Sequence, residues 1–246
     1  YSWHARNTSL TLPSSLLMSS SFASPSAPIA AAQAVLQQFG ITPDRCEILQ
    51  NASTLVVRFT EHIVARIVQD TNGPRQGTSW FERENSIAEH LTNLQAPIIP
   101  LSSRLPKGPH LHLNYPMNFW EFVTILPDSP APESIGATLA QCHNALRSFS
   151  YPLPINGILT ESLSILESRT VLPTSTQTLL YKLLARSVDR LQHAPLQALH
   201  GDAHTGNLLQ TTRGLLWTDW EDAFSGPIEW DIASIIWNAL ILDDNM

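Results

Sequence analysis

The sequence is poor in cysteine, with only Cys46 and Cys142 among 246 residues. The two lie far apart, and neither has a second cysteine at the short spacing of a metal site. This excludes a disulfide-rich scaffold and favours a reducing compartment, so we expect a cytoplasmic protein. We expect both cysteines to serve as small apolar residues.

Long apolar runs and basic clusters are also missing. No stretch of about eighteen apolar residues occurs, so the sequence predicts no membrane span. Lys and Arg number 14 against 21 Asp and Glu, which gives a net charge of -7. Because phosphate backbones are bound by clustered basic residues, this balance argues against nucleic acid as the main partner. The 43% hydrophobic content is typical of a globular chain.

Acidic residues are absent before Asp44. Residues 1–26 are rich in Ser, with Thr, Pro and Ala, and they contain Arg6 as the one basic residue. Three interpretations stay open: a disordered leader, a targeting peptide, or upstream sequence ahead of a start at Met18. We therefore begin the folded part at residue 27.

The rest of the chain divides into a strand-rich part and a helical part. Helical periodicity predicts helices at 27–40, 79–94, 133–148, 159–166 and 178–191. Short β-branched runs predict strands at 46–50, 55–59 and 63–68, and 97–116 reads as strand, loop and strand. A Pro-rich segment at 126–132 predicts the boundary between the two parts. We expect an α+β protein with a first lobe at 27–125 and a mainly helical second lobe at 126–246.

Two charged residues fall on faces that should be buried. Alternation along 63–68 puts Arg66 on one face with Val64 and Val68. Helical spacing puts Glu84 on the inward stripe of its helix, beside Ile87 and others. An inward carboxylate needs a cation, so we expect a bidentate pair between Glu84 and Arg66. Two separately solvated side chains remain the alternative.

The segment 200–231 concentrates acidic residues. From residue 199 to the end there are eight acids and one base, Arg213. Apolar runs at 208–210 and 215–217 flank a turn, which predicts a hairpin. If residue 210 pairs with 215, then Asn207 and Asp219 meet at its open end, and the preceding loop brings Asp202 there. Two carboxylates and an amide oxygen are hard ligands that suit Mg²⁺ together with phosphates.

Phosphoryl transfer needs such an arrangement, because one carboxylate must orient the attacking hydroxyl while others hold the metal. His200 and His204 also permit a zinc interpretation. We favour His200 as a structural residue and His204 as a residue that lines the cleft. Other residues nearby have simpler expected roles: Trp220 in the core, Asp222 and Asp231 in capping or loop anchoring, Glu221 as a second metal contact or a solvated side chain.

Three segments together resemble one known family. HGDAHTGN at 200–207, WTDWED at 217–222 and GPIEWDIA at 226–233 look like the motifs of the aminoglycoside phosphotransferase family of phosphotransferase enzymes. The resemblance implies a bilobal protein-kinase-like fold, with a five-stranded antiparallel first lobe and a helical second lobe. It also implies transfer of the γ-phosphate of ATP or GTP, with Mg²⁺, to a hydroxyl of a small acceptor.

The resemblance assigns roles by position. Asp202 would be the catalytic base, with Asn207 and Asp219 as metal ligands. Arg66 would contact phosphate, and Glu84 would be its helix partner. In the linker between the lobes, the backbone groups of Glu121 and Val123 would meet the nucleotide base.

The sequence departs from the family pattern in three places. The loop at 50–53 has no glycine, Arg66 replaces the commoner Lys, and the chain stops at Met246 soon after a helix begins. We therefore keep two alternatives: a catalytically impaired nucleotide-binding module of the same fold, and a metal-dependent hydrolase. The sequence specifies neither the acceptor nor the oligomeric state, and the acceptor pocket is expected to be incomplete.

Overall fold

The computed structural model describes residues 25–52, 54–69, 77–168, 172–191 and 193–241. The predicted leader therefore lies outside the described residues, apart from Pro25 and Ser26 at the start of the first helix. Asp243 and Asp244, two of the eight acids near the end of the chain, lie outside them too.

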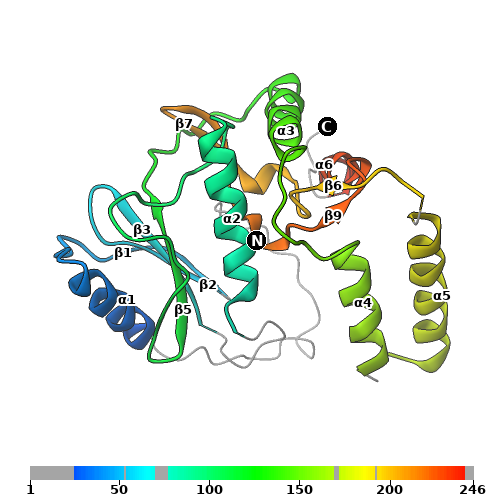
Figure 1. The fold of residues 1–246 in the computed structure, drawn as a ribbon, viewed down its shortest axis with the longest axis horizontal. Helices are drawn as coiled ribbons and strands as arrows, with labels where there is room; N and C mark the ends of the chain where they lie inside the picture. The colour runs from blue at the N-terminus through cyan, green and yellow to red at the C-terminus, as the bar shows by residue number, and fades with distance from the viewer. Residues whose placement is uncertain (1–24, 53, 70–76, 169–171, 192, 242–246) are drawn as a thin grey trace.

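A five-stranded antiparallel sheet forms the first lobe, at the left of Figure 1. Its order is β1-β2-β3-β5-β4. The predicted hairpin between the second and third strands is confirmed, because Leu55 pairs with Ile67 and Val57 with Ala65. The strands are β1 (Glu47–Asn51), β2 (Thr54–Arg58), β3 (Ile63–Val68), β4 (His110–His112) and β5 (Tyr115–Glu121).

Helix α1 (Ser26–Gln38) covers one face of this sheet (Figure 1). Its small and apolar side chains recur at helical spacing, which gives the helix one stripe to bury. The sheet contributes the alternate residues of three strands, as the period of two requires. The resulting core contains Ala31, Ala32, Val35, Leu36, Leu55, Val57, Ile63, Ala65, Ile67, Met117 and Phe119.

Helix α2 (Ser79–Asn93) lies on the other side of the sheet and faces the second lobe (Figure 1). The predicted inward stripe is confirmed, since Ile87, Ala88 and Leu91 are fully buried and Glu84 is buried with them. Arg66 lies on the same side of the sheet, on β3, and it is 9% exposed. Two opposite charges are thus buried between one helix and one strand.

The second lobe is mainly helical, with two short strand pairs and two single-turn 3-10 helices inserted among the described residues. A two-stranded hairpin, β7 with β8, carries the predicted register: Leu208 pairs with Trp217 and Gln210 with Leu215. The elements are α3 (Pro132–Leu146), α4 (Gly157–Ser168), α5 (Thr174–Leu191), β6 (Gln197–Ala198), η1 (Thr205–Asn207), β7 (Leu208–Thr211), β8 (Gly214–Trp217), η2 (Trp220–Asp222), β9 (Ser225–Gly226) and α6 (Glu229–Ile241). The protein has the expected α+β, bilobal, protein-kinase-like fold.

One hydrophobic core joins the two lobes. It combines the inward residues of α2 with those of α3 and of the β7–β8 hairpin, and Trp120 and Val123 enter it from the first lobe. Trp217 and Trp220 are fully buried there, as expected for Trp220. Because this core lies between the lobes, it fixes β3, α2 and the hairpin relative to one another.

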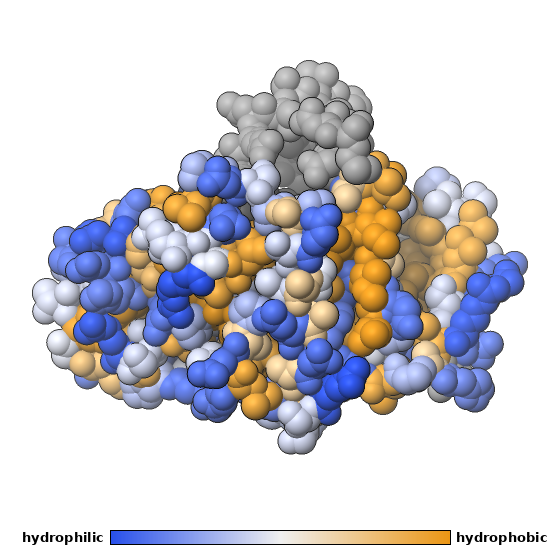
Figure 2. Space-filling model, turned by 90° about the horizontal axis from the view of Figure 1, so that it is seen from above, coloured by the Kyte–Doolittle hydropathy of each residue, from blue (hydrophilic) through white to orange (hydrophobic). Residues whose placement is uncertain are grey.

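Several apolar side chains of the second lobe reach the surface. Figure 2 shows hydrophobic residues gathered in a band on the face seen from above. On α6, Trp237 is 61% exposed and Leu240 is 62% exposed. Cys142 is buried, as suits a small apolar residue, whereas Cys46 is exposed just before β1. Within the described helices, none combines the length and hydropathy needed to cross a bilayer.

Candidate active site

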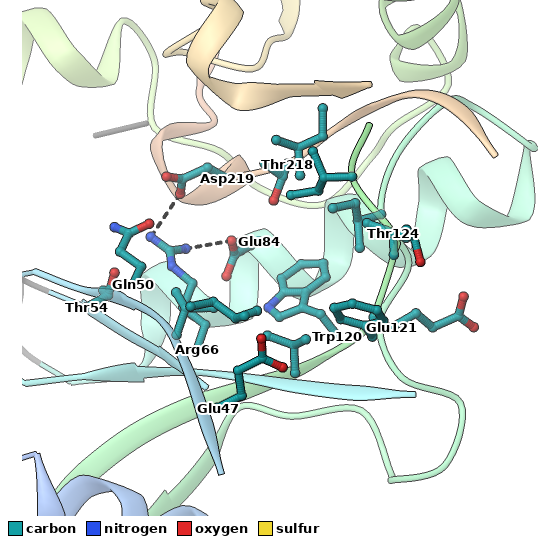
Figure 3. A pocket seen from close by; sticks show the side chains of 18 residues that line it. Glu47, Gln50, Thr54, Arg66, Glu84, Trp120, Glu121, Thr124, Thr218 and Asp219 are labelled. Carbon is teal, nitrogen blue, oxygen red and sulfur yellow. Dashed lines mark hydrogen bonds and ion pairs between the residues drawn. The ribbon is translucent and has the colours of Figure 1, made fainter. Parts of the chain in front are cut away.

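A cavity of about 400 Å³ opens between the sheet of the first lobe and the hairpin of the second. Figure 3 shows the side chains that line it, with Arg66, Glu84 and Asp219 at one end and Trp120, Glu121 and Thr124 at the other. Its volume is in the range of pockets that hold small ligands. Apolar walls come from Leu49, Val56, Val64, Ile99, Trp120, Val123 and Leu209.

The expected contact between Arg66 and Glu84 is present. Arg66 Nη1 donates to Glu84 Oε1 at 2.8 Å, and both side chains are largely buried. The bidentate geometry that we expected is wrong, because the second oxygen, Glu84 Oε2, accepts from Asn118 Nδ2 at 3.0 Å. Asn118 stands directly opposite Arg66 on β5, so the sheet itself supplies this second donor.

The other terminal nitrogen of Arg66 meets two further carboxylates. Arg66 Nη2 donates to Glu221 Oε2 at 2.6 Å. It also lies 2.9 Å from Asp219 Oδ1, as an ion pair rather than a well-directed hydrogen bond. Glu221, for which a metal contact or a solvated side chain is expected, is 18% exposed at its side chain and binds Arg66. One guanidinium therefore faces three carboxylates.

Burial and charge act in opposite directions on this cluster. Burial opposes the charge on Arg66, but the surrounding carboxylates outweigh it and raise the pKa of the guanidinium above its ordinary value. Burial raises the pKa of Glu84 to about 8, against the effect of Arg66. Glu84 therefore tends to keep its proton, and Asp219 and Glu221 are the carboxylates that raise the pKa of Arg66 most.

The hairpin brings Asn207 and Asp219 to its open end, where Thr218 N donates to Asn207 O at 2.9 Å. Asp202 joins them, because Asn207 Nδ2 donates to the Asp202 carbonyl oxygen at 3.0 Å. Asp219 has left-handed backbone angles, φ 66° and ψ 59°, a conformation that Asp tolerates better than most residues. The sequence prediction that these three residues converge is therefore met by the geometry.

Two oxygens of this group fit a hard cation. Within the described residues, no hydrogen-bond donor reaches the buried Asn207 Oδ1, and the buried Asp219 Oδ1 has the 2.9 Å ion pair with Arg66 but no directed hydrogen bond. Buried acceptors without a donor are rare, and an amide and a carboxylate oxygen are ligands that Mg²⁺ accepts. The residues present thus fit a divalent ion held by Asn207 and Asp219.

Asp231 anchors the loop that carries Asp202. Its carboxylate is fully buried and accepts from His200 N and Gly201 N, each at 2.9 Å. His143 Nε2, from α3, lies 2.8 Å from Asp231 Oδ2. The prediction of loop anchoring for Asp231 is confirmed, while the part of His143 had no signal in the sequence.

Gly201 is required by the close approach of two loops. It has φ +87°, and a Cβ atom there would lie 2.1 Å from the carbonyl oxygen of Asp222. Any other residue would have to push this carbonyl away, which would move the start of the Asp202 loop.

The two histidines of the motif have their ring nitrogens engaged within the loop. His200 Nε2 lies 3.0 Å from Thr218 O, and His200 Nδ1 accepts from Asp202 N. His204 Nδ1 accepts from Gly206 N, and its Nε2 lies 3.5 Å from Asp202 Oδ2. His204 therefore packs on Asp202 instead of lining the cavity. Among the described residues no group of three His, Cys, Asp or Glu could hold a metal ion, which disfavours the zinc interpretation.

Asp202 is held in its ionised form. The hydrogen bond with His204 is the main cause that lowers the pKa of Asp202 below its ordinary value, although partial burial acts in the opposite direction. An ionised carboxylate can only accept hydrogen bonds, so Asp202 can orient a hydroxyl group that donates to it.

Glu121 and Val123 lie at the other end of the cavity. Phe122 N donates to His62 O, so Ile63 and Glu121 form the non-hydrogen-bonded kind of pair, and the Glu121 carbonyl points away from β3. The amide of Glu121 is bound to Pro100 O. No hydrogen bond within the described chain uses the backbone of Val123. One carbonyl and one amide therefore remain to meet a ligand.

Gln50 is a lining residue that sequence reasoning missed. Strand β1 contains an irregularity between Ile48 and Gln50, where the register against β2 shifts by one residue. Because such a bulge re-aims the next side chain, Gln50 joins Leu49 in the cavity wall instead of pointing to the opposite face. Figure 3 shows the Gln50 side chain beside Arg66 and Asp219. Simple alternation gave no signal of this.

Comparisons with known proteins show which families and folds this chain resembles. A comparison with curated protein sequences found no match. Among solved structures, an amicoumacin kinase in complex with AMP-PNP, Ca²⁺ and Ami superposes with a TM-score of 0.67, 15% identity, and coverage of 86% of this chain and 70% of that chain. A variant of an aminoglycoside 2'-phosphotransferase-IIIa in complex with GDP gives a TM-score of 0.61 and 16% identity, and it covers 86% and 78%.

A third structure, a choline/ethanolamine kinase family protein from Mesorhizobium loti, gives a TM-score of 0.55 and 18% identity, with coverage of 84% and 68%. At these identities the superpositions establish the fold alone. The model of the phosphotransferase enzyme family matches residues 40–245, which include the sheet, the cavity and every residue of the Asp202 loop and the hairpin. The chain therefore belongs to the phosphotransferase enzyme family.

Proposed function

We propose that this protein is a small-molecule kinase that transfers the γ-phosphate of ATP or GTP to a hydroxyl group of a small acceptor. The observation that carries the proposal is a buried amide oxygen without a donor, Asn207 Oδ1, in the group that also contains Asp219, which lines the cavity together with Arg66. Metal ligands, a phosphate-binding cation and a ligand cavity are the parts that phosphoryl transfer requires.

The nucleotide base would occupy the end of the cavity near the linker. There the Glu121 carbonyl and the Val123 amide can meet a base edge, while Val64 and Leu209 offer apolar surfaces to its faces. The triphosphate would then extend toward Arg66. Relatives in complex with AMP-PNP and with GDP support a nucleotide ligand but leave ATP and GTP both open.

Asn207 and Asp219 would hold Mg²⁺. When bound, the ion would offset the negative charge of the phosphates and of the acidic cluster. Arg66 would contribute a second positive charge. Glu84 would hold the guanidinium of Arg66 in place through the contact with Nη1.

Asp202 would act on the acceptor. Its ionised carboxylate would accept a hydrogen bond from the attacking hydroxyl, orient it toward the γ-phosphate and take up its proton. Asp231 would support this by holding the backbone of the loop through Gly201 and His200.

The decisive test measures nucleotide binding and turnover separately. We expect ATP or GTP with Mg²⁺ to raise the melting temperature of the parent protein, because a ligand that binds the native state stabilises it. We expect Asp202→Asn to keep this shift and to lose phosphate transfer by at least about a thousandfold, in line with removal of a general base and an orienting group.

The outcomes separate three functions. A variant that transfers phosphate as fast as the parent would refute the role of Asp202. A nucleotide-dependent shift without turnover on any acceptor would favour the impaired binding module. The absence of any shift, together with metal-dependent hydrolysis of an ester, would favour the hydrolase.

The acceptor itself is to be found by screening. We expect its determinants on the helices between residues 134 and 193, and a panel of antibiotics, sugars and amino alcohols assayed for nucleotide consumption would identify its class. A cytoplasmic location and a small-molecule acceptor instead of nucleic acid remain predictions from composition.

A further inference from the structure

Helix α3 reaches both segments that carry the residues of the candidate active site. Its Thr138 Oγ1 accepts from Nε1 of Trp217, on the β7–β8 hairpin, at 3.2 Å. Further along the helix, His143 Nε2 lies 2.8 Å from Oδ2 of Asp231, in the first turn of α6. Asp231 in turn binds the start of the loop that carries Asp202. One helix thus contacts the hairpin directly and the loop through a single carboxylate.

The helix is itself firmly packed. Leu139, Cys142 and Leu146 are almost completely buried in the core between the lobes. His143 is 8% exposed, so it lies at the edge of the same buried stripe. A side chain on such a helix can keep a partner in place, because moving it would require the surrounding core to repack.

His143 completes the hydrogen bonds of the Asp231 carboxylate. That carboxylate is fully buried, and it accepts from Gly201 N with Oδ1 and from His200 N with Oδ2. A carboxylate offers only acceptor positions, so Nε2 of His143 carries the proton of the contact between them. Among the described residues, the imidazole is the one side-chain donor to Asp231, since the other two donors belong to the loop itself.

The first turn of α6 needs this link to the core. Trp230 also holds the loop, because its Nε1 donates to Gly201 O at 2.8 Å. Within the described part of α6, however, Asp231 is the one buried residue, so little apolar packing fixes this helix. The contact with His143 therefore ties both loop-holding residues of α6 to a helix that is packed in the core.

We propose that His143 is a positioning residue of the kinase reaction, which acts through Asp231 to set where Asp202 meets the attacking hydroxyl. The inference rests on the proposed function, since it takes Asp202 as the group that orients the acceptor. Loss of the donor would let the loop backbone shift, and a misplacement of about 1 Å can cost about a hundredfold in rate. Nucleotide contacts would persist, because no residue from 199 to 206 lines the cavity.

The kinetic test compares two variants at this position. His143→Phe keeps an aromatic ring without the donor, whereas His143→Gln places an amide nitrogen close to the former position of Nε2. With the acceptor found by screening, we expect His143→Phe to lower kcat about tenfold to a hundredfold and to change the KM of the nucleotide by less than about threefold. We expect His143→Gln to keep kcat within about threefold of the parent, because its amide can donate to Asp231.

Hydrogen exchange follows the loop without any turnover. The amides of His200 and Gly201 are protected as long as they stay bonded to Asp231. We expect peptides that cover residues 199–206, measured by mass spectrometry, to exchange at least about tenfold faster in His143→Phe than in the parent. In His143→Gln the exchange should stay close to that of the parent.

His90→Leu is the matched control. His90, on α2, also bridges to another helix, with its Nε2 3.0 Å from the Ala145 carbonyl oxygen on α3, but it makes no hydrogen bond to Asp231 or to the loop within the described chain. We expect its kcat and its loop exchange to stay within about threefold of the parent values. An equal loss in this variant would reduce the effect to a general loosening around α3 and overturn the inference.

Other results would overturn it as well. One is an unchanged kcat of His143→Phe, with or without faster exchange. Another is a loss in His143→Gln as large as in His143→Phe, which would show that the donor is not what matters. A third is a higher KM for the nucleotide with the kcat of the parent, which would place the effect in binding.

Failure of the proposed function would look different. In that case the parent transfers phosphate to no acceptor, and the exchange measurement by itself decides whether His143 holds the loop. Faster exchange in His143→Phe then supports the hold on the loop, and unchanged exchange overturns it.

A further variant covers the case in which His143→Phe does not fold, as judged by its thermal transition. His143→Asn stays polar, but its amide ends closer to the helix than Nε2 does and cannot reach Asp231. We expect kcat and loop exchange to change in the same direction as in His143→Phe. No change in this variant would contradict the inference.

Discussion

Helices α2 and α5 are both amphipathic, yet they differ in what covers them. Seven residues of α2 are buried, among them Glu84 and Leu91, and the helix packs on the sheet, on α3 and on η2. Helix α5 has no buried residue, and Leu183 is 51% exposed. The packed region between the lobes therefore holds the cluster of Arg66 with its acidic partners in place. The α4–α5 pair contributes little to the stability of that region.

The largest effect should come from removing the charge at the centre of the packed region. We expect Arg66→Met to lower the free energy of unfolding by about 3–5 kcal/mol, because it leaves buried carboxylates without their cation. Urea denaturation measures the change. Arg213→Met is the control: it breaks a more exposed pair, Arg213 with Glu121, and should cost no more than about 1 kcal/mol. Equal costs would contradict the view that burial decides the value of these pairs.

A second pair of variants compares the two helices directly. We expect Leu91→Ala on α2 to lower stability by about 2–5 kcal/mol, since it removes a fully buried side chain and leaves a cavity. The same change at Leu183 on α5 should cost below about 1 kcal/mol. If Leu183→Ala proved as costly as Leu91→Ala, α5 would have to be packed in solution, and the contrast between the helices would be wrong.

The pH dependence of stability should report on Glu84. Its folded pKa of about 8 lies above its ordinary value of 4.5, so the folded chain retains a proton that the unfolded chain releases. The stability from this group is therefore complete below about pH 4.5 and is lost as pH rises through 8. We expect the stability of the parent relative to Glu84→Gln to fall over this window. A flat difference from pH 5 to 8 would show that Glu84 is ionised throughout.

The smallest effect concerns Gln50. Its side chain is directed toward Arg66 and Asp219 by the bulge in β1, so we expect Gln50→Ala to weaken binding of the triphosphate about threefold to tenfold while leaving the nucleoside unaffected. Calorimetry with both ligands checks this. Gln69→Ala, which removes contacts to the β1–β2 loop outside the cavity, is the control. An equal loss of affinity for the nucleoside would show that Gln50 does not act through the phosphates.

Much of the arrangement could be predicted from sequence where a local pattern carried it. The register of the β7–β8 hairpin followed from its turn and its two short apolar runs, and the structure has the same pairs. Periodicity alone placed Glu84 and Arg66 on inward faces, and the need to neutralise a buried carboxylate then paired them. The roles of Asp202, Asn207 and Asp219 in catalysis remain predictions that the experiments above address.

Other features could not be predicted because they depend on contacts between distant segments. His143 reaches Asp231 across 88 residues, and nothing in either neighbourhood marks the pair. Cys46 is exposed because it lies just before the first strand of the sheet. The apolar character of a cysteine does not indicate where a sheet begins.

By itself, the sequence determined most of the helices, the first three strands, the β7–β8 hairpin and the inward position of Arg66 and Glu84, because periodicity, turns and charge neutralisation are local or pairwise properties. Only the tertiary structure decided which acid Arg66 binds with its second nitrogen and where Gln50 points. The physical reason is that a hydrogen bond forms only between atoms about 3 Å apart, which depends on how complete elements pack. A bulge likewise shifts the alternation of side chains by one residue, and it forms where two complete strands pair.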